Sequence, residues 1–241
     1  MTRTDGRVLV AGATGKTGQH VVEALSETPF VVRAVTRDAD AADSLRAQGV
    51  GEVVVGDLLD PDDAARAVAD VDAVVSAVGA ALRLEDIRGD LVDGTGLVNL
   101  IDAAADADVK RFVLTSSIGV GDSKDGLPLS IRAILTAGGV LSAKARSEER
   151  LKETSMDYTI VRPGALTDSP ATGDVLVGEG GDSVCGSIPR TDVANVLVHA
   201  LFTPETENRT FEIVSQPGLR DPPNTLVDVE WGQIPRAEPA E

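Results

Sequence analysis

Short runs of apolar, mostly β-branched residues alternate with longer polar stretches through residues 1–160. Each run is continuous rather than alternating, which is typical of strands that are covered on both faces in a parallel sheet. One further run lies near the C-terminus. We therefore predict parallel strands at residues 7–11, 30–35, 52–55, 72–76, 111–114 and 158–161, and another strand at 209–214.

Stretches rich in alanine and leucine separate these strands, and each is long enough for a crossover helix. Pro61 suits a helical first turn, because the N–H that it lacks would have no partner there. Thr191 or Asp192 is expected to cap the last helix. The predicted helices are residues 18–27, 39–48, 61–69, 90–107, 141–154 and 191–202. The alternation predicts an α/β fold with a doubly wound parallel sheet.

The chain changes character after Pro163. Residues 1–215 are expected to form a single domain, in which 164–215 contribute a small C-terminal portion on the substrate side. Within that portion, residues 174–188 predict a β-hairpin with a glycine-rich turn. Residues 216–241, rich in proline and acidic side chains, predict an extended tail.

A glycine-rich segment, Gly-Ala-Thr-Gly-Lys-Thr-Gly at residues 12–18, directly follows the first strand and opens a helix. This arrangement places backbone N–H groups and the helix dipole where a pyrophosphate would lie. Gly12 permits the tight turn, Gly15 lets the backbone approach the phosphates, and Gly18 allows close packing. A P-loop is excluded, because its pattern needs a glycine where Val10 stands. The predicted cofactor-binding residues here are Gly12, Thr14, Gly15, Lys16, Thr17 and Gly18.

The end of the second strand decides between the two dinucleotides. An acidic side chain there accepts from the ribose 2′-OH of NAD, whereas a basic one accommodates the 2′-phosphate of NADP. The strand runs into Arg37, which predicts NADP, with Lys16 and Arg33 as further cations. Asp38 follows directly and leaves NAD open.

Charge and composition limit the classes of partner. The chain has 39 acidic and 22 basic residues, a net charge of −17 at pH 7, which argues against nucleic acid and anionic membranes. The acidic excess suggests a halophilic protein, the alternative being an ordinary acidic protein of a GC-rich genome. One cysteine, Cys185, and two histidines offer no disulfide and no metal site. With no secretion signal and no membrane helix, we expect a cytoplasmic monomer or homodimer that binds a small-molecule substrate.

Five motifs in order resemble the atypical short-chain dehydrogenase/reductases, in particular their NmrA-like and biliverdin/flavin reductase-like branches. They occupy residues 12–18, 56–58, 114–117, 143–149 and 157–164, and the resemblance extends over about residues 7–215. It implies a Rossmann fold that binds NAD(P)H. It says far less about the substrate.

The resemblance also implies roles for individual residues. Asp57 and Leu58 would flank the adenine. The residues that would pass close to the adenine ribose and diphosphate are Ala77, Val78 and Gly79. Those that would lie beside or line the nicotinamide are Thr115, Ser116, Pro163, Gly164, Ala165 and Leu166.

Two residues are candidates for catalysis on the same resemblance. Ser117 occupies the position of the catalytic serine, and Lys144 would hydrogen-bond the hydroxyls of the nicotinamide ribose. The alternatives remain open that Ser116 and Ser117 only end a strand and that Lys144 is a solvated helix lysine.

The sequence departs from the family at its proton donor. The family uses Tyr-x-x-x-Lys, but Val140 stands four residues before Lys144, and the one tyrosine, Tyr158, falls in a predicted strand. Valine has no proton to give, so the usual exchange between alcohol and ketone is in doubt. Hydride transfer to a flavin- or quinone-like acceptor needs no such donor. Residues 121–141, which contain several glycines, could form a lid over that acceptor.

The leading hypothesis is therefore an NADPH-dependent oxidoreductase with a flavin- or quinone-like acceptor. A non-catalytic NADP(H) sensor or scaffold protein is the alternative from a different class. A sugar-nucleotide epimerase or dehydratase shares the fold and is the third, least favoured hypothesis.

Overall fold

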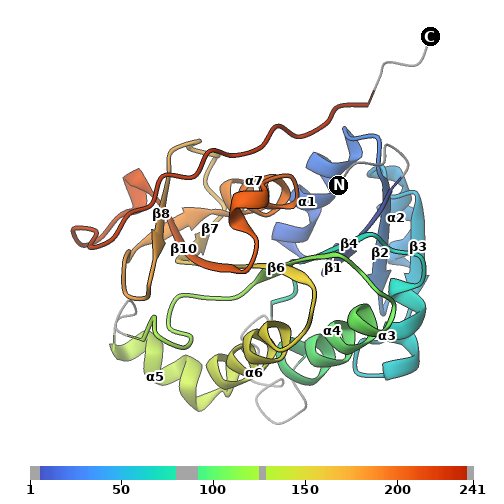
Figure 1. Cartoon of the computed structure of the whole chain (residues 1–241), viewed down its shortest axis with the longest axis horizontal. Helices are drawn as coiled ribbons and strands as arrows, with labels where there is room; N and C mark the ends of the chain where they lie inside the picture. Colours follow the sequence, from blue (N-terminus) through green and yellow to red (C-terminus); the bar gives the residue numbers. More distant parts are fainter. Residues whose placement is uncertain (1–5, 80–91, 125–128, 238–241) are drawn as a thin grey trace.

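The computed structural model describes residues 6–79, 92–124 and 129–237 of the chain. An eight-stranded sheet lies at its centre, with the order β3-β2-β1-β4-β5-β6-β10-β8 (Figure 1). Strand β8 runs antiparallel to β10, and the other neighbours in this sheet run parallel. Its strands are β1 (Arg7–Ala11), β2 (Val31–Thr36), β3 (Glu52–Val55), β4 (Ala73–Ser76), β5 (Arg111–Thr115), β6 (Asp157–Pro163), β8 (Val175–Glu179) and β10 (Arg209–Ser215). The predicted α/β fold with a doubly wound parallel sheet is confirmed.

Helices cover both faces of this sheet. Helices α1 and α7 pack together on one face, and α3, α4 and α6 lie on the other (Figure 1). The helices are α1 (Lys16–Ser26), α2 (Ala41–Ala47), α3 (Pro61–Val68), α4 (Leu97–Asp106), α5 (Leu129–Ala137), α6 (Val140–Lys152) and α7 (Arg190–Leu201). A π-helical turn, η2 (Val92–Gly96), leads directly into α4. Within the described residues, no helix is long and apolar enough to cross a membrane.

Neighbouring residues of the central strand β1 enter different cores. Val8 and Val10 pack with α1 and α7, whereas Leu9 and Ala11 pack with α3 and α4. All four side chains are fully buried. Because both faces of the strand are covered, residues 8–11 are all apolar, and this produces the continuous run from which the strand was predicted.

The predicted hairpin at residues 174–188 is wrong. Strand β8 pairs with β10, while β9 (Ser187–Pro189) pairs with β7 (Ala165–Thr167) in a separate small sheet. Between β8 and β9, the N–H groups of Asp182 and Ser183 donate to the buried carboxylate of Glu212, at 2.9 and 2.6 Å. These amides are therefore committed to a side chain from β10 and do not extend a ladder along β8.

The prediction that Thr191 or Asp192 caps α7 is also wrong. The buried carboxylate of Asp192 accepts from the N–H and hydroxyl of Thr172, at 2.8 and 2.7 Å, and from the N–H of Gly173 at 3.1 Å. The Thr191 hydroxyl lies 3.3 Å from Nε2 of His20. Asp192 therefore fastens the loop before β8 to the first turn of α7.

The residues after β10 run back across α7 toward α1 (Figure 1). Their apolar side chains pack against the core on that face, and the N–H of Ala237 donates to the carbonyl of Glu27 at 2.9 Å. The packed side chains are Val227, Val229, Trp231 and Ile234.

Helix α5 is an element that the sequence pattern did not predict. It lies within residues 121–141, where a lid is expected, and it exposes Leu129 and Ile134. Gly126 and Pro128 of the same segment lie outside the described residues.

Candidate functional site

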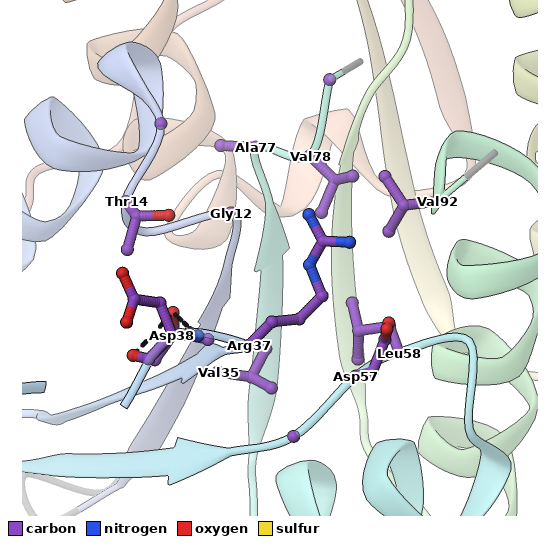
Figure 2. A pocket seen from close by; sticks show the side chains of 14 residues that line it. Gly12, Thr14, Val35, Arg37, Asp38, Asp57, Leu58, Ala77, Val78 and Val92 are labelled. Atoms are coloured by element: carbon purple, nitrogen blue, oxygen red, sulfur yellow. Dashed lines mark hydrogen bonds between the residues drawn. The ribbon is translucent and has the colours of Figure 1, made fainter. Parts of the chain in front are cut away.

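A cleft of about 640 Å³ opens where β1, β2 and β4 end (Figure 2). The strand order changes direction between β1 and β4, and ligands of doubly wound sheets bind at such a switch point. Nine residues predicted to bind the cofactor line this cleft: Gly12, Thr14, Gly15, Arg37, Asp57, Leu58, Ala77, Val78 and Gly79. Sequence reasoning did not single out Val35, Thr36 and Val92, which line it as well.

The glycine turn at the base of the cleft tolerates no side chain at two positions. Gly12 has a φ of +82°, and a Cβ there would lie 2.8 Å from the backbone of Ala77. A Cβ on Gly18 would lie 2.0 Å from the carbonyl oxygen of Gly12. The turn is closed by the N–H of Gly15, which donates to the Gly12 carbonyl at 2.9 Å. Thr17 and Gly18 lie buried in the first turn of α1. The first N–H groups of a helix have no partner within it, so those of α1 can bind a ligand at the loop.

Arg37 and Asp38 follow β2, and both line the cleft. Arg37 reaches toward Val78 and Val92, and it forms no hydrogen bond or ion pair with the residues that the structure describes (Figure 2). Asp38 lies nearer Thr14, and its carboxylate accepts from the N–H of Asp40 at 2.9 Å. Among the described residues, the geometry thus offers a guanidinium without a partner and a carboxylate that already accepts from a backbone amide.

Lys16 and Arg33 are directed away from this cleft. Lys16 forms an ion pair with Asp168 at 2.5 Å, and Arg190 binds the same carboxylate. The hydrogen bond from Lys16, helped by the charge of Arg190, lowers the pKa of Asp168. Arg33 pairs with Glu52 at 2.6 Å. Of the three cations predicted around the cofactor, Arg37 is therefore the one that lines the cleft.

Residues 115–118 continue from β5 along the end of β6. The N–H of Ser116 donates to the carbonyl of Val161 at 2.7 Å, and the N–H of Ile118 donates to that of Pro163 at 3.1 Å. The hydroxyl of Ser117 donates to the carbonyl of Ile118 at 2.9 Å. The predicted nicotinamide-side residues from β5 and β6 thus meet at one edge of the sheet, outside the lining of the cleft.

The hydroxyl of Thr115 is buried and has no hydrogen-bond partner among the described residues. Buried hydroxyls in folded proteins almost always have one. A polar group bound beside the end of β5 would supply it. Together with the close backbone packing at Gly12 and Gly18, this is consistent with the prediction that a dinucleotide runs from the cleft along this edge of the sheet.

Lys144 is buried rather than solvated. Its ammonium nitrogen lies 2.6 Å from Oδ1 of Asp93 and 3.5 Å from the carbonyl oxygen of Thr115. Asp93 belongs to the turn η2 and is fully buried. The interpretation of Lys144 as a solvated helix lysine is therefore wrong. Val140, one turn earlier on α6, is also buried.

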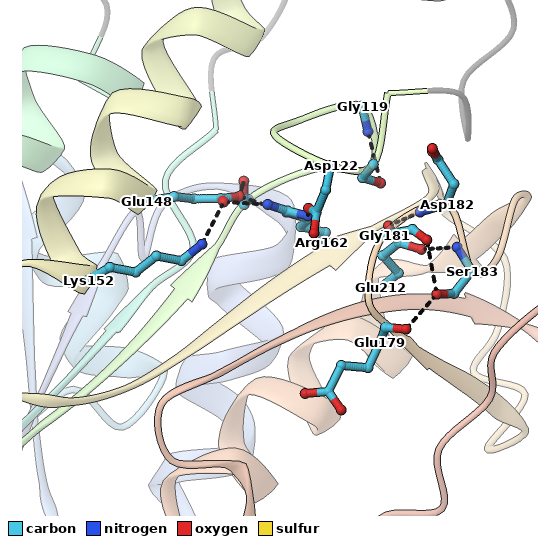
Figure 3. Close-up of polar contacts among 12 residues, drawn as sticks. Gly119, Asp122, Glu148, Lys152, Arg162, Glu179, Gly181, Asp182, Ser183 and Glu212 are labelled. Carbon is cyan, nitrogen blue, oxygen red and sulfur yellow. Dashed lines mark hydrogen bonds and ion pairs between the residues drawn. The ribbon is translucent and has the colours of Figure 1, made fainter.

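Glu148 lies one turn after Lys144 on α6, and its carboxylate binds several polar groups (Figure 3). Its carboxylate accepts from the hydroxyl of Ser116 at 2.5 Å and from Nε and Nη2 of Arg162 at 2.9 and 2.7 Å. Arg162 also binds Asp122. Burial by itself would lower the pKa of Arg162, but these two carboxylates outweigh it and raise that pKa. Ser116 therefore does more than end a strand, because its proton is committed to Glu148.

We call Asp93, Ser116, Lys144, Glu148 and Arg162 the buried charge cluster. Each of its five members is at least nine-tenths buried. Sequence reasoning named Ser116 and Lys144 but missed the other three. A signal was present for Arg162, a charged residue within an apolar strand, and for Glu148, four residues after Lys144 on the same helix face.

Pro163, Gly164, Ala165 and Leu166 lead from β6 into the small sheet of β7 and β9. Gly164 packs so closely that a Cβ would lie 2.4 Å from the carbonyl oxygen of Gly186. Ala165 and Leu166 are exposed, so they remain available to a bound molecule. In the described part of the chain, no cluster of metal-ligating side chains occurs.

Comparisons with known proteins agree with this geometry. A family model described as NAD(P)H-binding matches residues 12–204. The fold resembles a putative NAD-dependent epimerase/dehydratase from Bacillus halodurans, with a TM-score of 0.77, 33% identity, and coverage of 90% of this chain and 96% of that one. It also resembles an anaerobillin reductase from Escherichia coli O157:H7, with a TM-score of 0.76, 29% identity and coverage of 87% and 97%. Sanguinarine reductase from Eschscholzia californica is 28% identical over 253 aligned positions, covering 87% of this chain and 89% of the relative.

Proposed function

The chain belongs to the NAD(P)H-binding family, and from this premise we propose that it is an NADPH-dependent oxidoreductase that passes hydride to a flavin- or quinone-like acceptor. One observation carries the proposal: the glycine turn and Arg37 line a cleft at the switch point of the sheet, while on α6 the buried Val140 stands where the resembled family has its proton-donating tyrosine. Relatives described as reductases support the reaction class.

The residues that would hold the cofactor follow from the geometry of the cleft. The amides at the start of α1 and the glycine turn would bind the diphosphate, and Arg37 would bind the 2′-phosphate. Lys144 would reach the nicotinamide ribose. When bound, NADPH supplies a hydride, which carries two electrons and one proton.

The environment of the acceptor follows from the side chains that α6 presents. Val140 cannot protonate a substrate oxygen, so an acceptor that draws its proton from water is favoured. Leu166, exposed on β7 just after β6, would offer apolar surface to a flat ring system. Ser117 and Lys144 would orient the cofactor and acceptor.

The acceptor class is tested by following NADPH oxidation with flavins and quinones at low and high salt. We expect turnover with at least one of them and none with simple ketones. Absence of turnover with every flavin and quinone would contradict the proposal. Preferential reduction of ketones would contradict it as well.

The choice of coenzyme depends on Arg37. Arg37→Gln should weaken NADPH binding about 10- to 100-fold, the worth of one or two charge-assisted hydrogen bonds, and leave NADH binding unchanged. Asp38→Asn is the matched control, because it removes a charge from the same end of the cleft without touching the cation. Equal losses for NADPH and NADH in Arg37→Gln would argue against NADP.

An NADP(H) sensor is a second candidate, and a specific contact favours it. Asp168 follows β7 on the substrate side, yet it binds Lys16 of the glycine turn and Arg190 of α7. A diphosphate beside the turn would compete for Lys16 and could loosen this link. Calorimetry and activity assays together distinguish the two candidates. A sensor should bind NADP⁺ and NADPH with different affinities and should not reduce any acceptor.

A further inference from the structure

We propose that Asp93 sets the relative affinity of the site for NADP⁺ and NADPH by cancelling the charge of Lys144 beside the nicotinamide. This inference rests on the proposed function, and it concerns a residue that takes no part in the cleft. Asp93 acts through Lys144, so it is a positioning residue rather than a catalytic one.

The ion pair lies at the edge of the sheet where the nicotinamide is proposed to bind. The ammonium of Lys144 is 3.5 Å from the carbonyl oxygen of Thr115, the last residue of β5. The hydroxyl of Thr115 is buried and has no hydrogen-bond partner among the described residues. A charge on Lys144 would therefore act directly on a ring bound beside β5.

Asp93 is held firmly enough to cancel that charge. Its Oδ1 lies 2.6 Å from the ammonium, and its side chain is fully buried while that of Lys144 is 9% exposed. Its backbone carbonyl accepts from the hydroxyl of Ser147 on α6 at 2.7 Å. Water and salt screen buried charges less than exposed ones, so removing either partner would leave the charge of the other to act on its surroundings.

The sign of the effect follows from the charge change in hydride transfer. The hydride takes two electrons and one proton from C4 of the reduced nicotinamide to the acceptor, and the ring gains one positive charge. The acceptor takes its second proton from water. A lone ammonium beside the ring would oppose this gain of charge, whereas an ammonium paired with Asp93 does not.

The other charges of the buried charge cluster do not replace Asp93. Glu148 is one turn away on α6, but both of its oxygens are bound by Arg162. Arg162 is in turn shared with Asp122, and Lys152 approaches Glu148 only to 3.9 Å. Within the cluster, the carboxylate that meets Lys144 is that of Asp93.

The test measures the dissociation constants of NADP⁺ and NADPH at pH 8 for the wild type and three variants. In Asp93→Asn, the ratio Kd(NADP⁺)/Kd(NADPH) should rise about ten-fold, the order expected of one charge across a protein interior. Lys144→Met removes the ammonium while the carboxylate of Asp93 stays in place, so it should lower the ratio. The double variant Asp93→Asn/Lys144→Met has no charge at either position and should return the ratio to the wild-type value.

Circular dichroism and thermal unfolding establish which variants are folded. If Asp93→Asn does not fold, Lys144→Met and the neutral double variant still decide the matter, because the ratio must differ between them. A ratio that is the same in the wild type and in every folded variant would overturn the inference. A wild type that binds neither NADP⁺ nor NADPH would instead overturn the proposed function, so the two failures are distinguishable.

Discussion

The cofactor cleft and the buried charge cluster lie at the same edge of the sheet but are built by different means. The cleft owes its shape to main chain: glycines that admit no Cβ, a turn closed by backbone hydrogen bonds and the start of α1. The cluster owes its shape to charged side chains that satisfy one another away from water. The first arrangement depends on a few consecutive residues, and the second depends on partners drawn from four separate elements.

The cluster should be the more sensitive of the two regions to loss of one side chain. Arg162→Met leaves Glu148 buried without its main partner and should lower the free energy of unfolding by about 3–5 kcal/mol. Lys152→Met is the control, because Lys152 is 40% exposed and 3.9 Å from Glu148, and it should cost less than about 1 kcal/mol. Urea denaturation measures both. Similar losses of unfolding free energy in the two variants would show that burial of the Arg162–Glu148 pair does not determine its contribution to stability.

Adding a single methyl group to the glycine turn should distort the cleft. In Gly18→Ala, the new Cβ collides with the Gly12 carbonyl, so the turn must move; we expect a loss of about 1–3 kcal/mol in stability and at least a ten-fold weaker binding of NADPH. Gly138→Ala adds the same methyl where the nearest atom is 3.4 Å away and should change neither quantity. Unfolding curves and fluorescence titration provide the two measurements. Normal NADPH binding by Gly18→Ala would contradict the proposed role of the turn.

The smallest effect concerns Asp168, which links Lys16 of the glycine-rich segment to Arg190 of α7. Lys16 lowers the pKa of this carboxyl below its ordinary value of 3.8. A pKa that is lower in the folded state means that the link stabilises the fold above the ordinary pKa and is lost as the pH falls through the lowered one. Titration of the side-chain carboxyl carbon by NMR should show this shift. Lys16→Met should raise the pKa of Asp168, whereas Lys152→Met should leave it unchanged; no response to Lys16→Met would contradict the link.

Sequence reasoning located the parallel strands because strands covered on both faces are continuous apolar runs. It located most of the helices because stretches rich in alanine and leucine separate those runs. It failed for residues 174–188, where the amides after β8 donate to Glu212 on a strand some thirty positions further along. It failed again at Asp192, whose carboxylate holds a loop rather than its own helix. In both places a buried carboxylate accepts hydrogen bonds from residues distant in the sequence, and local secondary-structure propensity does not predict such contacts.

The amino-acid sequence by itself determined the layered α/β architecture, the position of the glycine turn and the loss of the tyrosine at Val140. These features depend on residue type within a few positions, since periodicity, backbone freedom and the presence of an ionisable proton are local properties. Tertiary structure alone decided that Lys16 turns to Asp168, that Lys144 is paired with Asp93 and that Glu148 binds Arg162. A charge excluded from water must find its counter-charge in space, and only the packed chain shows which carboxylate is within reach.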